Sequence, residues 1–292
     1  MRKVYLILTL VLIAGLGALG WRAWRSETVK DIRSIFVSNN TNTAGGISFA
    51  VIGDNEGENS IYNSLIQKIS NDKSIQFVLH VGDATSQGSA EELAALQTLH
   101  QKLGLTVPVY AVPGNHDIKT DPSRKAWTDA IGDPWRSVEI GNIHLVLLDN
   151  ADRKVGFPAE ELDWLEQDLT AVPAGKSIII AYHRPFNYPL ASIVGDDETT
   201  ASQKTNERFL NIIKKYPIVH IFTGHIHTSL DYTMTLVKDA NGNVIISVPV
   251  TISGGGGQPP QAGFGGLLPE KYHALKVLVN RGLVTTLIIL PD

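Results

Sequence analysis

The chain opens with an almost unbroken apolar run and then alternates between short apolar runs and helical patterns. The run from Val4 to Gly20 is interrupted only by Thr9, whereas residues 26–46 are polar and irregular. From Ile47 onward, apolar runs of strand length recur at 47–52, 75–81, 107–113, 143–148, 178–182 and 218–222. The pattern predicts an α/β domain that follows an apolar segment and a polar linker.

Apolar residues spaced three or four positions apart predict helices between these strands. The helical faces are Ile61/Leu65/Ile69, Leu93/Leu96/Leu99/Leu103 and Leu162/Leu165/Leu169, and a further helix is predicted around residues 206–215. Pro158 suits the first turn of the third helix because a helix leaves that N–H unpaired. The alternation of strand and helix predicts a sheet that is mainly parallel at its start.

Beyond Ser229 the pattern changes to successive strands. Strand-like stretches lie around Met234 and at 244–248, 274–279 and 284–290, and Asn241-Gly242 is a typical hairpin turn. A second hairpin is predicted to join 138–140 to 143–148 across Gly141-Asn142. The sequence shows no internal repeat and no domain boundary after Gly46.

The N-terminal apolar run has the features of a membrane-insertion signal. Arg2 and Lys3 precede it, and a cluster of Trp and Arg at 21–25 follows it, as in an interfacial belt. The run is near the lower limit for a spanning helix and longer than the usual apolar core of a cleavable signal peptide. We therefore expect an uncleaved anchor at 1–25, a flexible tether at 26–46 and one catalytic domain at 47–292.

This anchor predicts a single-pass membrane protein. Its N-terminus would be cytoplasmic and its catalytic domain extracytoplasmic, with the membrane contacted through residues 4–20. Ala18 and Gly20 are small enough for a cleavage site, in which case the domain would be secreted. A buried helix of a soluble domain is disfavoured, because such helices usually carry a polar stripe.

The charge of the chain argues against binding to polyanions. It has 292 residues with 25 basic and 29 acidic side chains, and four of the basic residues lie in the first 25 positions. Nonspecific affinity for a phosphate backbone needs clustered Lys and Arg on the folded domain, so we expect no nucleic-acid scaffold binding. The chain has no cysteine, which excludes disulfides, thiolate zinc sites and cysteine nucleophiles. The sequence leaves the oligomeric state open.

Five of the apolar runs end in side chains that bind metals. These groups are Gly53-Asp54-Asn55-Glu56, Gly82-Asp83, Gly114-Asn115-His116-Asp117, His183 and Gly224-His225-Ile226-His227. The carboxyl ends of parallel strands meet at one edge of a sheet, so these groups are expected to converge. Carboxylate, amide and imidazole ligands without thiolate suit Mn, Fe or Zn better than soft metals.

The order of these motifs resembles the calcineurin-like metallophosphoesterase family from about Ile47 to the C-terminus. The most specific parts are Gly-Asn-His-Asp at 114–117 and Gly-His-Ile-His at 224–227, placed on either side of a single strand-end His183. The resemblance implies a four-layer sandwich of two mixed β-sheets flanked by helices. It also implies two divalent or mixed-valence metal ions between the strand ends.

The resemblance further implies a role for each motif residue. The first metal would take Asp54, residue 56, Asp83 and His227, and the second would take Asp83 as a bridge with Asn115, His183 and His225. Together with Asn115, His116 would lie beside the substrate phosphate, where it neutralises charge or protonates the leaving oxygen. Asp117 would orient His116.

Glu56 departs from the family pattern, which usually has His at this position. As a ligand, Glu56 would lower the net charge of the site by one unit and weaken its attraction for phosphate. Glu56 is equally well interpreted as a residue that does not bind metal. Arg184, directly after His183, is a candidate phosphate contact and equally a surface arginine. The histidines His80, His100, His144, His220 and His273 are expected to pack or to lie on the surface.

The expected function is hydrolysis of phosphate mono- or diesters by a metal-bridging hydroxide, on a small-molecule or lipid substrate. Two alternatives share the fold. One is a metal-poor scaffold, and the other is a membrane-tethered module that binds a phosphorylated ligand without turnover. The chain retains six of the seven expected ligands, which favours the hydrolase over a scaffold whose site has lost its activity.

Overall fold

The computed structural model describes residues 46–189, 199–260 and 271–292. The predicted anchor and tether lie outside the described residues, so they remain predictions. Within the described ranges, no helix combines the length and the apolar character needed to cross a membrane. The description that follows concerns the unit that begins at Gly45.

The first sheet combines strands from the beginning and the end of the domain. Its strand order is β11-β10-β1-β2-β3, with β1 (Ile47–Ile52), β2 (Val78–His80) and β3 (Val109–Ala111) parallel to one another. On the other side of β1, β10 (Ala274–Asn280) runs antiparallel and pairs with β11 (Leu283–Ile289). The sheet is therefore mixed, and its parallel half delivers three strand ends to one edge.

The second sheet has six strands in the order β4-β5-β6-β7-β9-β8. Its parallel centre consists of β5 (Ile143–Leu147), β6 (Ser177–Ala181), β7 (Ile218–Thr223) and β9 (Val244–Ser253). The antiparallel edges are β4 (Arg136–Ile140), in a hairpin with β5, and β8 (Ser229–Lys238), in a hairpin with β9. The central strands β5, β6 and β7 are rich in β-branched and other apolar residues, as expected for strands buried on both faces.

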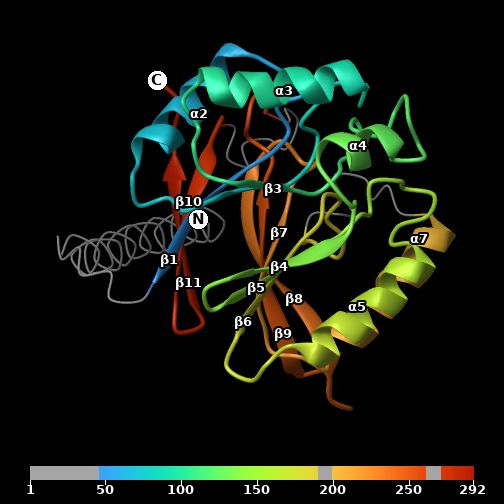
Figure 1. Ribbon diagram of the computed structural model, residues 1–292. Coiled ribbons are helices and arrows are strands. Elements are labelled where there is room, and N and C mark those ends of the chain that lie inside the picture. The colour runs from blue at the N-terminus through green and yellow to red at the C-terminus, as the bar shows by residue number, and fades with distance from the viewer. Residues whose placement is uncertain (1–45, 190–198, 261–270) are drawn as a thin grey trace, which may run out of the picture. The chain divides into compact units, whose positions relative to one another are not determined.

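Apolar cores separate the four layers. Residues such as Phe49 and Leu145 fill the space between the two sheets. On the outer side of the first sheet, α2 (Ser60–Asn71) and α3 (Ala90–Lys102) pack through Leu65 and Leu96. On the outer side of the second sheet, α5 (Ala159–Ala171) and α7 (Thr200–Ile213) pack through Leu165 and Phe209 (Figure 1). This arrangement confirms the predicted pair of mixed sheets flanked by helices.

Several predicted boundaries need correction. The strand predicted at 107–113 is shortened to Val109–Ala111, because Pro108 and Pro113 have no N–H to contribute to a ladder. The helix predicted at 206–215 begins earlier, at Thr200, where the Thr199 side chain accepts the N–H of Ser202 in a capping box. A short helix, α4 (Lys125–Ala130), was not predicted at all.

Candidate metal centre

The predicted ligands lie in tight loops just beyond the ends of β1, β2, β3, β6 and β7. Asp54, Glu56, Asp83 and His225 all have positive φ angles, between 47° and 69°. Such backbone conformations are costly for residues other than glycine, and they cluster at functional sites. The loops are held to one another by backbone hydrogen bonds, such as Asp54 N–H to Gly82 O (3.0 Å) and Glu56 N–H to Asp83 O (2.9 Å).

Glycine allows these loops to approach one another. A Cβ added at Gly114 would overlap the amide and carboxylate of Asp83, and one added at Gly224 would overlap the Asp54 carboxylate and Val81 O. The loops after β3 and β7 can therefore lie directly against the two aspartates only because these positions carry no side chain.

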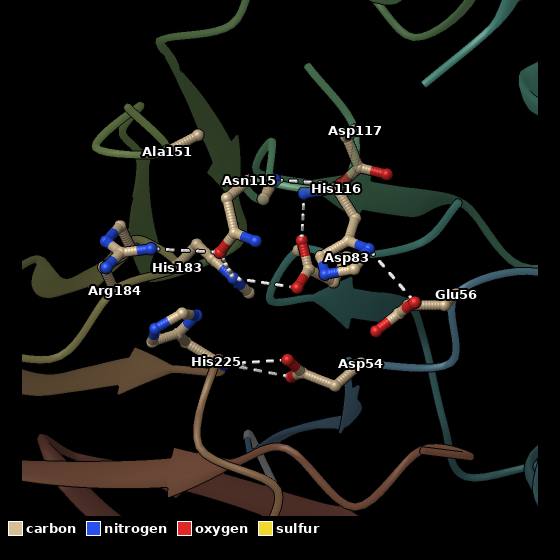
Figure 2. A network of polar contacts seen from close by, with 12 residues as sticks. Asp54, Glu56, Asp83, Asn115, His116, Asp117, Ala151, His183, Arg184 and His225 are labelled. Atoms are coloured by element: carbon tan, nitrogen blue, oxygen red, sulfur yellow. Dashed lines mark hydrogen bonds and ion pairs between the residues drawn. The ribbon is translucent and has the colours of Figure 1, made fainter. Parts of the chain in front are cut away.

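Asp83, Asn115, His183 and His225 lie close to one another (Figure 2). His183 Nε2 lies 3.3 Å from Asp83 Oδ2 and 3.2 Å from Asn115 Oδ1. The rings of His183 and His225 meet edge to face with centroids 5.1 Å apart. One ligand atom from each of Asp83, His183 and His225 lies within 4.8 Å of the others, so the structure brings together the ligands predicted for the second metal.

The ligands predicted for the first metal are more dispersed. Both carboxylate oxygens of Asp54 accept the backbone N–H of His225, at 2.9 and 3.1 Å. His227 Nε2 lies 3.8 Å from Asp54 Oδ1. In the described part of the chain, the other compact group of potential ligand atoms is Glu56, Asp83 and His116, to which Asp54 and His227 do not belong.

The side chains of Glu56 and His116 contact each other at the edge of the site. Glu56 Oε2 lies 3.0 Å from His116 Nδ1, and the two side chains are only 17% and 22% exposed. The same ring nitrogen lies 2.6 Å from Lys119 Nζ and 3.2 Å from Ser86 O. His116 is also tied to the centre by its backbone, because its N–H donates to Asp83 Oδ1 (2.7 Å). The sequence analysis did not single out Lys119.

Asp117 bonds to the loops around it. Its buried carboxylate accepts the Oγ1–H and N–H of Thr85, the N–H of Ala84 and the N–H of Gly114. The ring of His116 contacts other groups instead. Asp117 therefore joins the loop after β2 to the loop after β3, and this positions Asn115 and His116 through their backbone.

Arg184 and Asn150 complete the turn that carries His183. Arg184 Nη1 donates to Asn115 Oδ1 (3.1 Å), and Asn150 Oδ1 accepts the N–H groups of both His183 and Arg184 (3.1 and 2.9 Å). Asn150 follows β5 as the other site residues follow their strands, so the same signal at the strand end would have identified it. Next to this turn, a cleft of about 400 Å³ is lined by Lys119, Arg153 and Arg184 and reaches Asn115 and His225.

The buried charges interact strongly. Burial alone would raise the pKa of Asp83, but His183 and the N–H of His116 lower it below its usual range. Burial opposes the charged form of His183, yet Asp83 and Asp54 raise its pKa to about 9. Burial and the charge of Asp83 raise the pKa of Asp117 to about 6. A proton on His183 balances the buried carboxylates, a role that a bound cation would take over.

The donor set fits divalent cations. His183 Nδ1 lies 2.8 Å from Val81 O and His227 Nδ1 lies 3.1 Å from Pro259 O. A ring N–H donated to a backbone carbonyl leaves Nε2 as the ligand atom, an arrangement typical of metal-binding histidines. Asp83 belongs to both groups of potential ligand atoms.

Comparison with known proteins agrees with this geometry. The model of the family described as calcineurin-like phosphoesterase matches residues 47–229, which is more than half of the chain. The chain belongs to this family. The matched region begins with β1 and ends just after Gly224–His227, so it contains every predicted ligand.

Two curated relatives are named as phosphodiesterases. A 3',5'-cyclic-nucleotide phosphodiesterase of Nostoc sp. is 29% identical over 157 residues, which cover 52% of this chain and 56% of that protein. A probable glycerophosphodiester phosphodiesterase of Arcobacter nitrofigilis is 24% identical over 176 residues, which cover 58% of this chain and 62% of that protein. The chain thus spans less than two thirds of the length of either relative.

A solved structure supports the fold. The purple acid phosphatase from yellow lupin seeds aligns with a TM-score of 0.60 at 16% identity, over 80% of this chain and 49% of that chain. At this identity the likeness concerns the fold alone.

Proposed function

We propose that the chain is a metal-dependent phosphoesterase that prefers phosphodiesters. The observation that carries the proposal is the convergence of Asp83, Asn115, His183 and His225 at the ends of strands from both sheets. Membership of the calcineurin-like phosphoesterase family supports the reaction class. The names of the two curated relatives support the diester preference, which the sequence analysis left open.

Two cations would be held by the residues that the resemblance assigns. Asp83 would be shared, Asn115, His183 and His225 would hold one ion, and Asp54 and His227 would contribute to the other. When bound, such ions polarise the phosphoryl oxygens and make water nucleophilic at neutral pH. The strained loops around Asp54 and Asp83 fix these ligands before substrate arrives, so little reorganisation is needed on binding.

His116 is proposed to protonate the leaving oxygen. Its Nδ1 is engaged by Lys119 and Glu56, so Nε2 is the ring atom that remains for the substrate. In the proposed acid form both ring nitrogens carry a proton: Nδ1–H donates to the acceptor oxygens of Glu56 and Ser86, and Nε2–H faces the leaving oxygen. Lys119 Nζ lies beside the same Nδ1 and adds positive charge at this edge of the site.

Glu56 is proposed to act on His116 and not as a principal metal ligand. Its carboxylate makes its shortest contact with the His116 ring and lies on the opposite side of Asp83 from His183 (Figure 2). A carboxylate in this place stabilises a positively charged ring and fixes its orientation. The net charge of the metal site then stays higher than it would with Glu56 as a ligand.

The cleft beside Asn115 is proposed to bind the ester. Arg184 reaches the site through Asn115, and its guanidinium can bind a phosphate oxygen in a fixed direction. Lys119 and Arg153 add positive charge to the cleft walls, whereas Asp152 adds one negative charge. The cleft therefore suits an anionic phosphate ester.

We also propose that the enzyme is tethered to a membrane by residues 4–20, with its N-terminus in the cytoplasm and its catalytic domain outside. The support is the apolar run and its flanking residues in the sequence. Full-length protein should resist carbonate extraction from membranes, retain its first residues and expose the domain to protease added outside cells. Recovery of a soluble form that begins near Trp21 would instead support a cleaved signal peptide and a secreted enzyme.

A substrate panel tests the diester preference. Full-length protein is assayed with bis(p-nitrophenyl) phosphate, p-nitrophenyl phosphate, 3',5'-cyclic AMP and a glycerophosphodiester, each in Mn, Fe, Zn and Mg. We expect kcat/KM for diesters to exceed that for the monoester by at least about tenfold in the best metal, a difference of about 1.4 kcal/mol in transition-state binding. A preference for the monoester in every metal would refute the diester assignment.

A further inference from the structure

A second cavity lies beside the metal centre and shares no lining residue with the cleft described above. It has a volume of about 300 Å³, and most of its lining residues belong to α3, α4 and β3. Figure 1 shows where these three elements lie. Its walls include Leu96, Val109, Trp127 and Ile131, and its polar lining includes His80 and His100. A dry cavity of roughly 150 Å³ is enough to bind benzene, so this one has room for a molecule of one or two rings.

The walls of this cavity carry no charge. Among the described residues that line it there is no Asp, Glu, Lys or Arg. Burial lowers the pKa of His80 to about 3 and that of His100 to about 4, so both rings are neutral near pH 7. Because a buried charge without a partner is strongly disfavoured, the cavity suits an uncharged occupant.

The cavity wall also contains an unpaired hydrogen-bond donor. The side chain of Trp127 is 1% exposed, and its indole N–H has no acceptor among the described residues. Most buried polar groups in proteins are paired, so an unpaired one calls for an acceptor that is supplied from elsewhere. The apolar walls around Trp127 make an aromatic compound a suitable carrier of that acceptor.

We propose that this cavity binds an uncharged aromatic molecule of one or two rings whose carbonyl or ring acceptor pairs with the Trp127 indole N–H, and that the occupant acts on the metal loops through His80. The binding site does not depend on the proposed reaction.

His80 provides the route to the metal centre. Its Nε2 lies 2.8 Å from Asn55 Oδ1, and its Nδ1 accepts the N–H of Gly82 (3.3 Å). Asn55 lies between Asp54 and Glu56, and its Nδ2 donates to Ala84 O (3.0 Å). An occupant that restrains His80 therefore stabilises the loops after both β1 and β2. Metal affinity is expected to rise by at least about fivefold, at the lower end of typical coupling between sites.

A matched pair of compounds tests the binding site. 1-Indanone is an uncharged two-ring ketone, and indane has nearly the same shape without the acceptor. Each is added to the full-length chain, with free concentration measured by equilibrium dialysis, while the indole N–H resonances of the five tryptophans are followed by NMR. We expect 1-indanone to shift the Trp127 resonance saturably and to bind about fivefold more tightly than indane. No shift with either compound, or equal affinity for both, would overturn the proposal.

Variants separate the cavity from nonspecific effects. Trp127→Phe identifies the resonance and should abolish the preference for 1-indanone over indane. Ala130→Leu, which fills the cavity, should weaken binding at least tenfold, whereas Thr128→Leu on the exposed side of α4 should not. Mn²⁺ affinity measured by calorimetry with and without saturating 1-indanone tests the coupling. An unchanged affinity for Mn²⁺ would refute the proposed action through His80.

Discussion

Replacing Glu56 by Gln removes one charge from the contact with His116 and keeps the size of the side chain. The contact is a 3.0 Å ion pair between side chains that are only 17% and 22% exposed, so solvent screens it weakly. A hydrogen bond to a charged group contributes about 1.5–3 kcal/mol, and the lower end applies because Ser86 O still accepts from the ring. A loss of about 1.5 kcal/mol in the transition state corresponds to roughly a tenfold lower kcat.

The size of this loss should depend on the leaving group. A nitrophenolate leaves without a proton, whereas an alkoxide needs the acid, so Glu56→Gln should lower kcat about tenfold on an alkyl diester and little on a nitrophenyl diester. Both kcat values and the metal content by mass spectrometry are measured on the same preparation. Glu58→Gln, two residues away and exposed, is the control. Loss of one metal equivalent together with equal losses on both esters would show that Glu56 is a metal ligand, and would refute its assignment to His116.

Three further substitutions test other parts of the account. Asp83→Asn should lower metal content by at least one equivalent and kcat by about a thousandfold or more, because Asp83 is the ligand proposed to be shared by both ions. Arg184→Gln should raise KM about tenfold with a smaller change in kcat, and Arg208→Gln on α7 serves as its control. Burial alone would lower the pKa of His144, but Asp168 and Glu139 raise it. The contacts of His144 with these carboxylates therefore stabilise the fold fully below the pKa of about 6.5 that His has in the unfolded chain, and this stabilisation is lost as pH rises through the higher pKa of the folded state. Urea unfolding should therefore show that His144→Gln costs stability at about pH 5.5 and little at about pH 9.

Long apolar runs and their ends were the parts of the sequence that predicted structure well. Strand β1 was predicted at its observed bounds, and the two hairpins β4–β5 and β8–β9 followed from Gly141-Asn142 and Asn241-Gly242. The pairing of β10 with β1 could not be predicted from the sequence, because antiparallel pairing across more than two hundred residues leaves no local pattern. Helix α4 was missed because its six residues bury only Trp127 and carry no side-chain cap.

At the site, too, sequence patterns predicted some residues, whereas other contacts depend on how the loops pack. Metal-binding side chains at strand ends identified His183, and the same signal directly after a glycine identified Asp83, Asn115 and His225; the structure brings all four together. The contacts of Glu56 and Lys119 with His116 depend on how two loops from different strands approach each other, and no spacing in the sequence encodes that distance. The bonds of Asp117 to Thr85 and Gly114 likewise depend on the packed loops.

The most direct test of the central claim is a metal titration of diester hydrolysis. Full-length protein is stripped with a chelator and assayed with bis(p-nitrophenyl) phosphate as Mn²⁺ is returned, while bound metal is counted on the same samples. The account predicts that hydrolysis disappears on chelation and returns in step with the second equivalent of metal bound. Full turnover without metal, or binding of two equivalents with no hydrolysis of any diester, would contradict it.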